Sequence, residues 1–157
     1  MIFAAVGTQL PFRRLLTALD DIAGRHELDI IAQTADPDYA PLHIKAEPFL
    51  EPARFDQLVQ QAALLVGHAG IGLILAAKRF NKPLILYPRD ASLGEHRNDH
   101  QLATARALRP IKGVYIAWDN AMLEEKILQH DLAPANAEIT PERDRLITRI
   151  RDFIDKA

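Results

Sequence analysis

Cysteine is absent from this sequence of 157 residues, which removes several classes of chemistry at once. Without thiols the chain has no disulfide framework, no thiolate zinc site, no iron–sulfur cluster and no cysteine nucleophile. Long apolar runs are also missing, since none approaches the ~20 residues needed to span a bilayer. The apolar start of the chain has no preceding basic residue and is interrupted at Gly7, unlike a signal peptide. We therefore expect a soluble, cytoplasmic protein without a membrane span of its own.

An excess of either charge sign is lacking as well, because 19 Lys and Arg stand against 21 Asp and Glu, for a formal net charge of -2. No positive field of the whole molecule would attract nucleic acid or an anionic membrane. The composition, 48% hydrophobic and 25% charged, is typical of a globular protein and unlike that of disordered or fibrous chains. Domains usually contain about 100–150 residues, so residues 1–157 are predicted to form a single domain.

Short apolar segments alternate with amphipathic ones along the chain. The expected strands are 2–6, 28–32, 42–46, 63–66, 83–87 and 114–117, and the expected helices are 11–24, 55–62, 71–79, 98–108, 122–129 and one that starts at 141. Gly24 is expected to end the first helix and Asn81 to follow the third in a left-handed conformation, with Asp119 and Thr140 as N-caps. The alternation predicts a doubly wound α/β domain with a mostly parallel sheet, covered on both faces because its strands are apolar at consecutive positions.

Glycine-containing loops follow two of the predicted strands. The first reads Gly7-Thr8-Gln9, and the second reads Gly67-His68-Ala69-Gly70-Ile71-Gly72. Ligands of open α/β sheets bind outside the carboxyl ends of the strands, and glycines with free N–H groups at a helix start favour an anion such as phosphate. Simple tight turns of the sheet are the alternative interpretation. Neither the GxGxxG dinucleotide fingerprint nor the GK[ST] of a P-loop is present.

A polar segment, PRDASLGEHRNDHQ over residues 88–101, follows the predicted strand 83–87. Its hydrogen-bonding side chains gather at the start of a helix, where a solvated helix end is the alternative interpretation. Arg89 and His96 are candidates for phosphate contact by charge and position. His96 and His100 share a helical face, but no HExxH order or second ligand cluster supports a metal site. No GxSxG elbow follows a strand, which disfavours a Ser/His/Asp hydrolase.

The three segments together resemble a known family. VGT after the first strand, HAGxG after the fourth and PR…EHRNDHQ after the fifth are similar to the C-terminal domain of family 28 glycosyltransferases. By pattern they are most similar to the soluble donor-binding subunits of split two-component transferases, over residues 1–108. The resemblance implies one Rossmann-like half of a GT-B glycosyltransferase, whose active cleft lies between two such domains. A separate membrane-anchored subunit would hold the acceptor and the general base, and any recruitment to the inner face of the membrane would come through it.

The resemblance also implies roles for individual residues. Gly7 and Thr8 would face the diphosphate, residues 68–72 would lie beneath the phosphates, Phe49 and Leu50 would contact the uracil edge, and His100 and Gln101 would contact the sugar hydroxyls. The candidate nucleotide-sugar-binding residues are Gly7, Thr8, Phe49, Leu50, His68, Ala69, Gly70, Ile71, Gly72, Arg89, His96, His100 and Gln101. Leu73 and Ala76 depart from the family, which usually has Ser or Thr and a ribose-binding Glu there.

The activity implied by the resemblance is inverting transfer of a hexose from a UDP-sugar to a lipid-linked or polysaccharide acceptor, as in polysaccharide biosynthesis. Backbone N–H groups and helix dipoles would stabilise the leaving UDP, so no metal or other cofactor is expected. The general base is expected on the partner, so this chain would be inactive alone. The alternatives are a non-catalytic binding or scaffold subunit, which Leu73 and Ala76 favour, and a flavodoxin-like regulator, which Gly7-Thr8 and Gly67-His68 disfavour because they replace its acidic residues.

Overall fold

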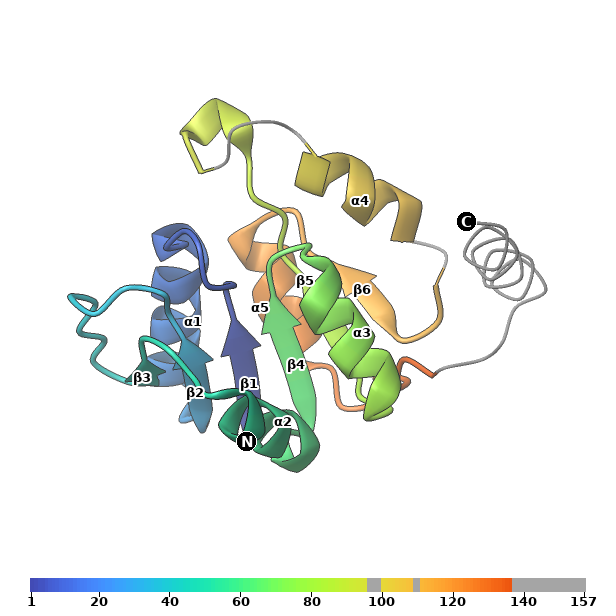
Figure 1. Cartoon of the computed structure of the whole chain (residues 1–157), viewed down its shortest axis with the longest axis horizontal. Coiled ribbons are helices and arrows are strands. Elements are labelled where there is room, and N and C mark those ends of the chain that lie inside the picture. The colour runs from blue at the N-terminus through green and yellow to red at the C-terminus, as the bar shows by residue number, and fades with distance from the viewer. Residues whose placement is uncertain (96–99, 109–110, 137–157) are drawn as a thin grey trace, which may run out of the picture.

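Six parallel strands form one sheet in the order β3-β2-β1-β4-β5-β6 in a computed structural model that describes residues 1–95, 100–108 and 111–136 (Figure 1). The strands are β1 (Ile2–Ala5), β2 (Ile30–Gln33), β3 (Lys45–Glu47), β4 (Leu64–Gly67), β5 (Leu84–Leu86) and β6 (Val114–Ile116). Each neighbouring pair is parallel. This order is that of the doubly wound Rossmann fold, which confirms the predicted α/β class.

Helices cover both faces of the sheet (Figure 1). They are α1 (Arg13–His26), α2 (Pro52–Gln61), α3 (Ile71–Arg79), α4 (His100–Leu108) and α5 (Asn120–Leu128), with a short 3-10 helix, η1, over Ala91–Leu93. The core on one face joins α1 and α5 to the sheet through Leu19 and Leu123. The core on the other face joins α2 and α3 to it through Leu58 and Ile74, with Ala105 of α4 at its margin. Each such large side chain stabilises the fold by about 1.5–3 kcal/mol when fully buried.

Local signals in the sequence predicted several boundaries correctly. Helix α3 has the predicted bounds, and Asn81 after it has a left-handed φ of 55°. Asp119 caps α5 by accepting a hydrogen bond from the Met122 N–H at 2.8 Å. Thr140 and the helix expected from residue 141 lie outside the described residues. Within the described residues, no helix is both long and apolar enough to cross a membrane.

The prediction that Gly24 ends the first helix is wrong. Helix α1 continues to His26 and ends at Glu27, which has a left-handed φ of 51°. Arg25 and His26 in the last turn both hydrogen-bond the carboxylate of Glu124 on α5, at 2.7–3.1 Å. These contacts hold the final turn against the neighbouring helix. Gly24 is instead a point of close packing, because a Cβ there would come within 2.8 Å of the His43 ring.

The carboxyl end of the sheet is where the small residues lie. Ala5, the last residue of β1, is in register with Gln33 of β2 on one side and with Gly67 of β4 on the other. Residues in register on parallel strands point to the same face, so these three are neighbours on one face of the sheet. The missing side chain of Gly67 on β4 lets Leu73 of α3 pack closely against this edge. The strand predicted at 28–32 begins two residues later, at Ile30, and ends one residue later, at Gln33.

Candidate functional site

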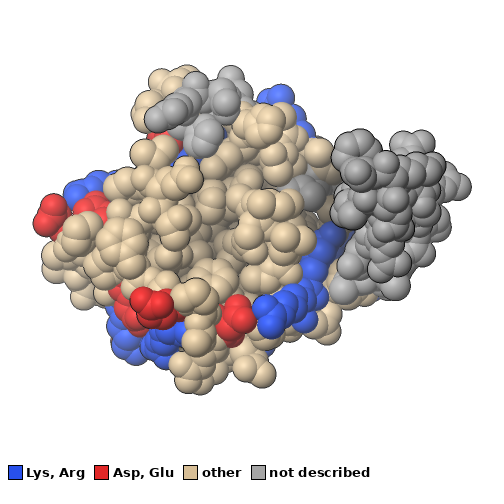
Figure 2. Space-filling view, in the orientation of Figure 1, with Lys and Arg blue, Asp and Glu red and all other residues tan. Residues whose placement is uncertain are grey.

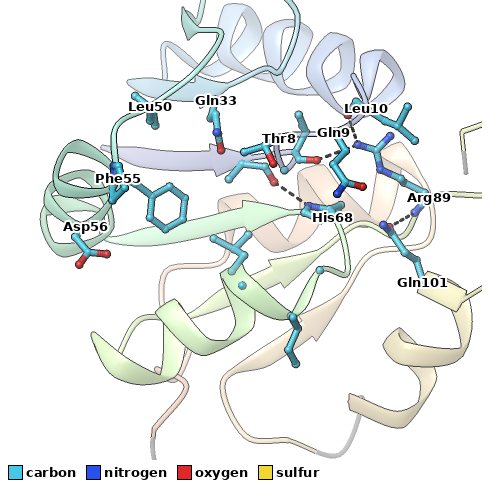
Figure 3. Close-up of a pocket in the computed structure, with 18 residues that line it drawn as sticks. Thr8, Gln9, Leu10, Gln33, Leu50, Phe55, Asp56, His68, Arg89 and Gln101 are labelled. Carbon is cyan, nitrogen blue, oxygen red and sulfur yellow. Dashed lines mark hydrogen bonds between the residues drawn. The ribbon is translucent and has the colours of Figure 1, made fainter.

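A cavity of about 610 Å³ opens at the carboxyl end of the sheet, where β1 and β4 lie side by side (Figure 3). The strand order reverses direction here, and open α/β sheets bind their ligands at such a point. The cavity is lined by Ala5, Val6, Gly7, Thr8, Gln9, Leu10, Gln33, Leu50, Pro52, Phe55, Asp56, His68, Gly70, Ile71, Gly72, Leu73, Arg89 and Gln101. Both glycine-containing loops singled out in the sequence therefore border one cavity.

The loop after β1 packs directly against His68, which follows β4 (Figure 3). Gly7 has a left-handed φ of 87°, and a Cβ built on it would lie only 3.0 Å from Cε1 of His68. A Cβ on Gly70 would overlap the same imidazole. The Nδ1 atom of His68 lies 3.4 Å from the carbonyl oxygen of Ala5, which can only accept, so Nδ1 carries the proton. Glycine at both positions is thus required for the imidazole to occupy the cavity wall.

Helix α3 presents its N-terminus to the cavity. Gly70 is its N-cap, no side chain caps it, and its first turn contains no acidic residue. The backbone N–H groups of a first helical turn have no partner within the helix and carry partial positive charge. Ile71, Gly72 and Leu73 line the cavity, so their N–H groups border the space that a ligand would fill, whereas the Gly70 N–H donates to the carbonyl oxygen of His68. Such a helix start binds phosphate groups well.

Arg89 is buried at the edge of the cavity, with an exposed fraction of 2%. Its Nη1 atom donates to the carbonyl oxygens of Pro11 and Glu95, and its Nη2 atom donates to those of Val6 and Leu10, at 2.5–3.3 Å. The guanidinium group also lies over the ring of Phe12, 4.6 Å from its centroid. Burial lowers the pKa of Arg89, but an arginine stays charged at neutral pH. Three of these bonds, to Val6, Leu10 and Pro11, fix the course of the loop between β1 and α1.

Arg14 and Glu95 form an ion pair beside Arg89. Arg14 donates from Nε and Nη2 to the two carboxylate oxygens of Glu95, at 2.6 and 2.8 Å. The hydrogen bond to Glu95 raises the pKa of Arg14. Glu95 is therefore neutralised by Arg14, and no described carboxylate forms an ion pair with Arg89. The group of three side chains leaves one positive charge at the edge of the cavity, which favours an anionic ligand.

Gln101, the second residue of α4, is held by the main chain of Arg89 (Figure 3). Its Oε1 atom accepts the Arg89 N–H at 3.0 Å, and the residue is 8% exposed. The bond orients the amide so that its NH2 group is the end left to donate to a ligand. No described residue accepts from that group. Gln101 is suited to bind a hydroxyl or phosphate oxygen in the cavity.

The opposite side of the cavity is apolar. Leu50, Pro52, Phe55 and Leu73 contribute the walls there, and Phe55 packs edge-on against Phe3 of β1 with 5.4 Å between ring centroids. The cavity thus has one polar part, formed by the glycine loops and the start of α3, and one apolar part near the start of α2. A ligand with a charged group and a flat apolar group would match both.

The structure brings together nine of the predicted site residues: Gly7, Thr8, Leu50, His68, Gly70, Ile71, Gly72, Arg89 and Gln101. Phe49 is 62% exposed and Ala69 is buried in the core, and neither lines the cavity. His100 is exposed at the first residue of α4 and is not a lining residue either. His96 lies outside the described residues. The roles of these residues in binding stay predictions.

Acidic side chains in this region leave little negative charge on the cavity wall. Asp56 lines the cavity but pairs with Arg79 at 3.1 Å. Asp36 and Asp38 form an Asp-x-Asp sequence, yet Asp36 is paired with Arg13 at 2.7 Å and neither lines the cavity. Among the described residues, no group of three or more His, Asp or Glu side chains could hold a metal ion. The charge that this wall offers to a ligand comes from Arg89 and from backbone N–H groups.

The family of the chain is shown by its match to the model of the glycosyltransferase family 28 C-terminal domain, over residues 1–156. The chain belongs to this family. The fold is correspondingly that of the C-terminal half of GT-B glycosyltransferases. No curated protein sequence matches the chain.

Solved structures share the fold of this family 28 domain at low sequence identity. MurG of Acinetobacter baumannii is 19% identical with a TM-score of 0.67, and the match covers 99% of this chain and 49% of MurG. UDP-GlcNAc 2-epimerase of Methanocaldococcus jannaschii, solved with UDP-GlcNAc and UDP, is 12% identical with a TM-score of 0.59, covering 97% and 44%. ALG13 is 18% identical with a TM-score of 0.63, covering 92% and 93%. The chain thus spans about half the length of MurG and nearly the whole of ALG13.

Proposed function

We propose that this chain is the donor-binding half of an inverting glycosyltransferase that uses a UDP-sugar. The observation that supports this most directly is the cavity at the switch point, which is bordered by both glycine loops, an uncapped helix N-terminus and Arg89. An activated sugar needs both parts of this cavity, because it joins a flat base to a charged pyrophosphate. Membership of family 28 supplies the reaction class.

The donor would lie across the cavity with its pyrophosphate, base and sugar in three different parts of it. Its pyrophosphate would accept hydrogen bonds from the first turn of α3 and from the loop that contains Gly7 and Thr8. Its base would fill the apolar part near Leu50, and its sugar would face Gln101 and the start of α4. In this arrangement Arg89 stabilises the phosphate charge through the field of a buried cation and through the loop that it holds.

Inverting transfer requires an acceptor hydroxyl to attack the anomeric carbon opposite the bond to UDP. The new C–O bond forms as the bond to UDP breaks, UDP leaves with its negative charge, and a base removes the hydroxyl proton. The cradle at α3 stabilises the departing UDP. Asp56 is the one carboxylate among the described lining residues, and its pairing with Arg79 makes it a poor base. The base therefore comes from elsewhere.

A second, membrane-anchored polypeptide would supply that base and the acceptor, which is lipid-linked or a growing polysaccharide. In the matches to MurG and to the 2-epimerase, this chain corresponds to about half of each protein. Its match to nearly the whole of ALG13 supports a domain of this size acting as a separate polypeptide. Any location at the inner face of the membrane would follow from this partner.

Calorimetry and amide NMR with UDP and UDP-sugars test the donor site. We expect saturable binding, with shifts concentrated at the loops around Gly7 and Gly70, at the start of α4 and around Leu50, where the base would lie. A phosphate-free control, uridine, should bind much more weakly because it lacks the pyrophosphate. Transfer assays on the isolated chain should show little or no product. Robust transfer without a partner would contradict the division of labour between two polypeptides.

A non-catalytic binding or scaffold subunit is the second candidate. Leu73 favours it, because this buried side chain lines the cavity and its Cδ2 fills the space beside Gly67. Leu73 has no hydroxyl to offer a nucleotide, and Ala76 one turn later has no carboxylate. Each missing polar contact costs about 1–3 kcal/mol. Absence of UDP binding at millimolar concentration would establish this candidate over the enzyme.

A further inference from the structure

The peptide group between Pro88 and Arg89 is held on both sides by side chains from two different helices. Its carbonyl oxygen accepts a hydrogen bond from Nη2 of Arg14, the second residue of α1, at 3.0 Å. Its N–H donates to Oε1 of Gln101, on α4, also at 3.0 Å. In a trans peptide group the C=O and the N–H point in opposite directions. Arg14 and Gln101 therefore lie on opposite sides of one peptide group and are connected through it.

Arg14 is itself fixed by an ion pair and by an aromatic ring. It donates to both carboxylate oxygens of Glu95, at 2.6 and 2.8 Å, and its guanidinium lies over the Tyr87 ring, 4.4 Å from the centroid. Oε2 of Glu95 also accepts the N–H of Asp90 at 2.9 Å. Glu95 thus bonds both to α1 and to the start of its own segment, residues 88–95. This arrangement holds the segment against α1 and fixes the plane of the peptide group that Arg14 contacts.

The contacts on the two sides of the peptide group meet the cavity at one point only. Neither Arg14 nor Glu95 lines the cavity, whereas Gln101 does. The bond from the peptide N–H to Oε1 of Gln101 decides which end of the amide is left for a ligand. A charged donor on the carbonyl side polarises the peptide group and strengthens the bond that its N–H donates. Arg14 therefore acts on both the direction and the strength of the contact that orients Gln101.

We propose that Arg14 and Glu95 are positioning residues, which hold Gln101 in the orientation needed to bind the donor sugar. This inference rests on the proposed function, in which the sugar faces Gln101 and the start of α4. Arg14 acts through the peptide group, and Glu95 acts by holding Arg14. The pyrophosphate and the base bind in other parts of the cavity, so the pair affects recognition of the sugar more than that of the nucleotide. No sequence motif pointed to Arg14, because its partners Pro88 and Glu95 lie 74 and 81 residues away.

The sugar preference of the chain tests this role. It is the Kd for UDP divided by the Kd for a UDP-sugar, measured by calorimetry with whichever of UDP-glucose, UDP-galactose and UDP-GlcNAc the wild-type chain binds most tightly. We expect Arg14→Gln and Glu95→Gln each to lower this ratio about tenfold. A pure charge effect would move the ratio in opposite directions in the two variants, because UDP carries more negative charge than a UDP-sugar. A merely structural role would lower the melting temperature and leave the ratio of the folded protein unchanged. Either of these two results would overturn the proposal.

A double variant shows whether the pair acts through Gln101. Gln101→Leu should lower the sugar preference at least as much as Arg14→Gln does, and combining the two substitutions should lower it no further. Losses that multiply in the double variant would overturn the proposal, because residues that act independently contribute additive free energies. Arg14→Lys keeps the charge but has one ammonium group for two acceptors, so it should lower the ratio by a smaller factor. This milder variant carries the test if Arg14→Gln does not fold.

A second ion pair of α1 provides the matched control. Arg25 donates from Nε and Nη2 to both carboxylate oxygens of Glu124 on α5, at 3.1 and 2.9 Å, and neither residue lines the cavity. Arg25→Gln and Glu124→Gln should therefore leave the sugar preference at the wild-type value. A loss in these variants equal to that in Arg14→Gln would overturn the proposal, since any broken pair on α1 would then have the same effect.

Failure of the donor function would look different. If the wild-type chain binds neither UDP nor a UDP-sugar, the proposed function is wrong and the positioning role falls with it. If the wild-type chain binds both ligands but Gln101→Leu keeps the sugar preference, nucleotide binding stands and the positioning role is overturned. If Gln101→Leu lowers the preference while Arg14→Gln and Glu95→Gln keep it, the donor function stands and only the role of the pair is lost.

Discussion

Arg89 determines the shape of the loop between β1 and α1. All four of its Nη hydrogens are used by carbonyl oxygens of Val6, Leu10, Pro11 and Glu95. Arg89→Lys keeps the charge but offers a single ammonium group, which cannot reach four separate acceptors. We expect it to lower the free energy of unfolding by about 2–3 kcal/mol and to weaken UDP binding at least tenfold. Denaturant titration and calorimetry measure the two effects.

The same variant separates two roles of Arg89. If the residue acts only as a positive charge near the phosphates, lysine would preserve most of the affinity. Loss of affinity in Arg89→Lys therefore assigns its effect to the loop. Arg106→Lys, at an exposed position on α4, is the matched control and should leave stability and binding unchanged. Wild-type affinity in Arg89→Lys would show that the loop does not depend on these bonds.

Asp20 of α1 holds the segment that leads into β3. Its carboxylate accepts the backbone N–H groups of Leu42, His43 and Ile44 at 2.7–3.0 Å. Burial acts to raise its pKa, but the three N–H donors, together with the charge of the nearby His43 ring, outweigh burial, so the pKa of Asp20 lies below its ordinary value. Asp20→Asn has one acceptor oxygen in place of two, and its NH2 group would face an N–H donor. We expect a loss of about 2 kcal/mol in the free energy of unfolding at pH 7.

The effect of Asp20 depends on pH in a defined direction. Because the folded pKa is depressed, the stabilisation is fully present above the unfolded value of about 3.9 and is lost as the pH falls through the folded value. The difference between wild type and Asp20→Asn should therefore be constant from pH 5 to 7 and shrink in more acidic solution. Asp21→Asn, an exposed neighbour, is the control and should show no such difference. A difference that grows toward acidic pH would contradict the assignment.

The N-terminus of helix α3 is the proposed anion site, and a negative charge placed there tests this role of the helix. Ile71 is 66% exposed in its first turn, and Ile71→Glu would place a carboxylate at the positive end of the helix. Such a charge stabilises a helix by about 0.3–1 kcal/mol, so the melting temperature should not fall. The carboxylate would compete with the phosphates, and we expect UDP to bind at least tenfold more weakly in calorimetry at low salt.

Leu75→Glu provides the matched control for that substitution. Leu75 is 58% exposed on the same helix and is not a lining residue, so its variant should bind UDP normally. If both variants lose the same affinity, the effect comes from net charge rather than from the helix start. If neither loses affinity, the phosphates do not lie at α3.

The elements themselves were largely predictable from local signals, but some of their ends were not. Helix α3 and the Asp119 cap follow from spacing and capping within a few residues of chain. The end of α1 depends on Glu124, which lies far away in the sequence, so Gly24 gave a false signal. Strand register is a contact between distant segments, which is why the placement of Gln33 beside Ala5 could not be derived from the sequence.

The candidate site, like the fold, was predictable from the sequence only in part. Glycine loops that follow strands meet at the carboxyl edge in any parallel sheet, so the grouping of Gly7 with Gly70 was predictable. Arg89 was singled out by its charge and position. Its hydrogen bonds could not be predicted, because three of its four carbonyl partners lie far away in the sequence and only Glu95 is near. His100 and Gln101 are adjacent in sequence, yet only Gln101 lines the cavity, because successive helical residues face different directions.

The molecule as a whole has its exposed apolar side chains concentrated around the cavity end of the sheet. Of the large apolar residues that are exposed, five follow the carboxyl ends of strands: Leu10, Phe49, Ile71, Leu93 and Trp118. In the view of Figure 2 the charged side chains lie mainly toward the rim of the face, and its middle is uncharged. Exposed apolar surface next to a cavity indicates contact with another polypeptide. The proposed acceptor-binding subunit would cover this end of the molecule.

Leu93 tests that arrangement, because it is 61% exposed on η1 and does not line the cavity. Leu93→Asp places a charge where the partner would bury apolar surface, so complex formation with the acceptor-binding subunit should weaken at least tenfold, with UDP affinity unchanged. Leu128→Asp, at the far end of α5, is the control and should assemble normally. Co-purification and transfer assays on the reconstituted pair measure both. Normal assembly and transfer with Leu93→Asp would mean that the partner covers another surface, since a buried unpaired carboxylate could not be accommodated at that interface.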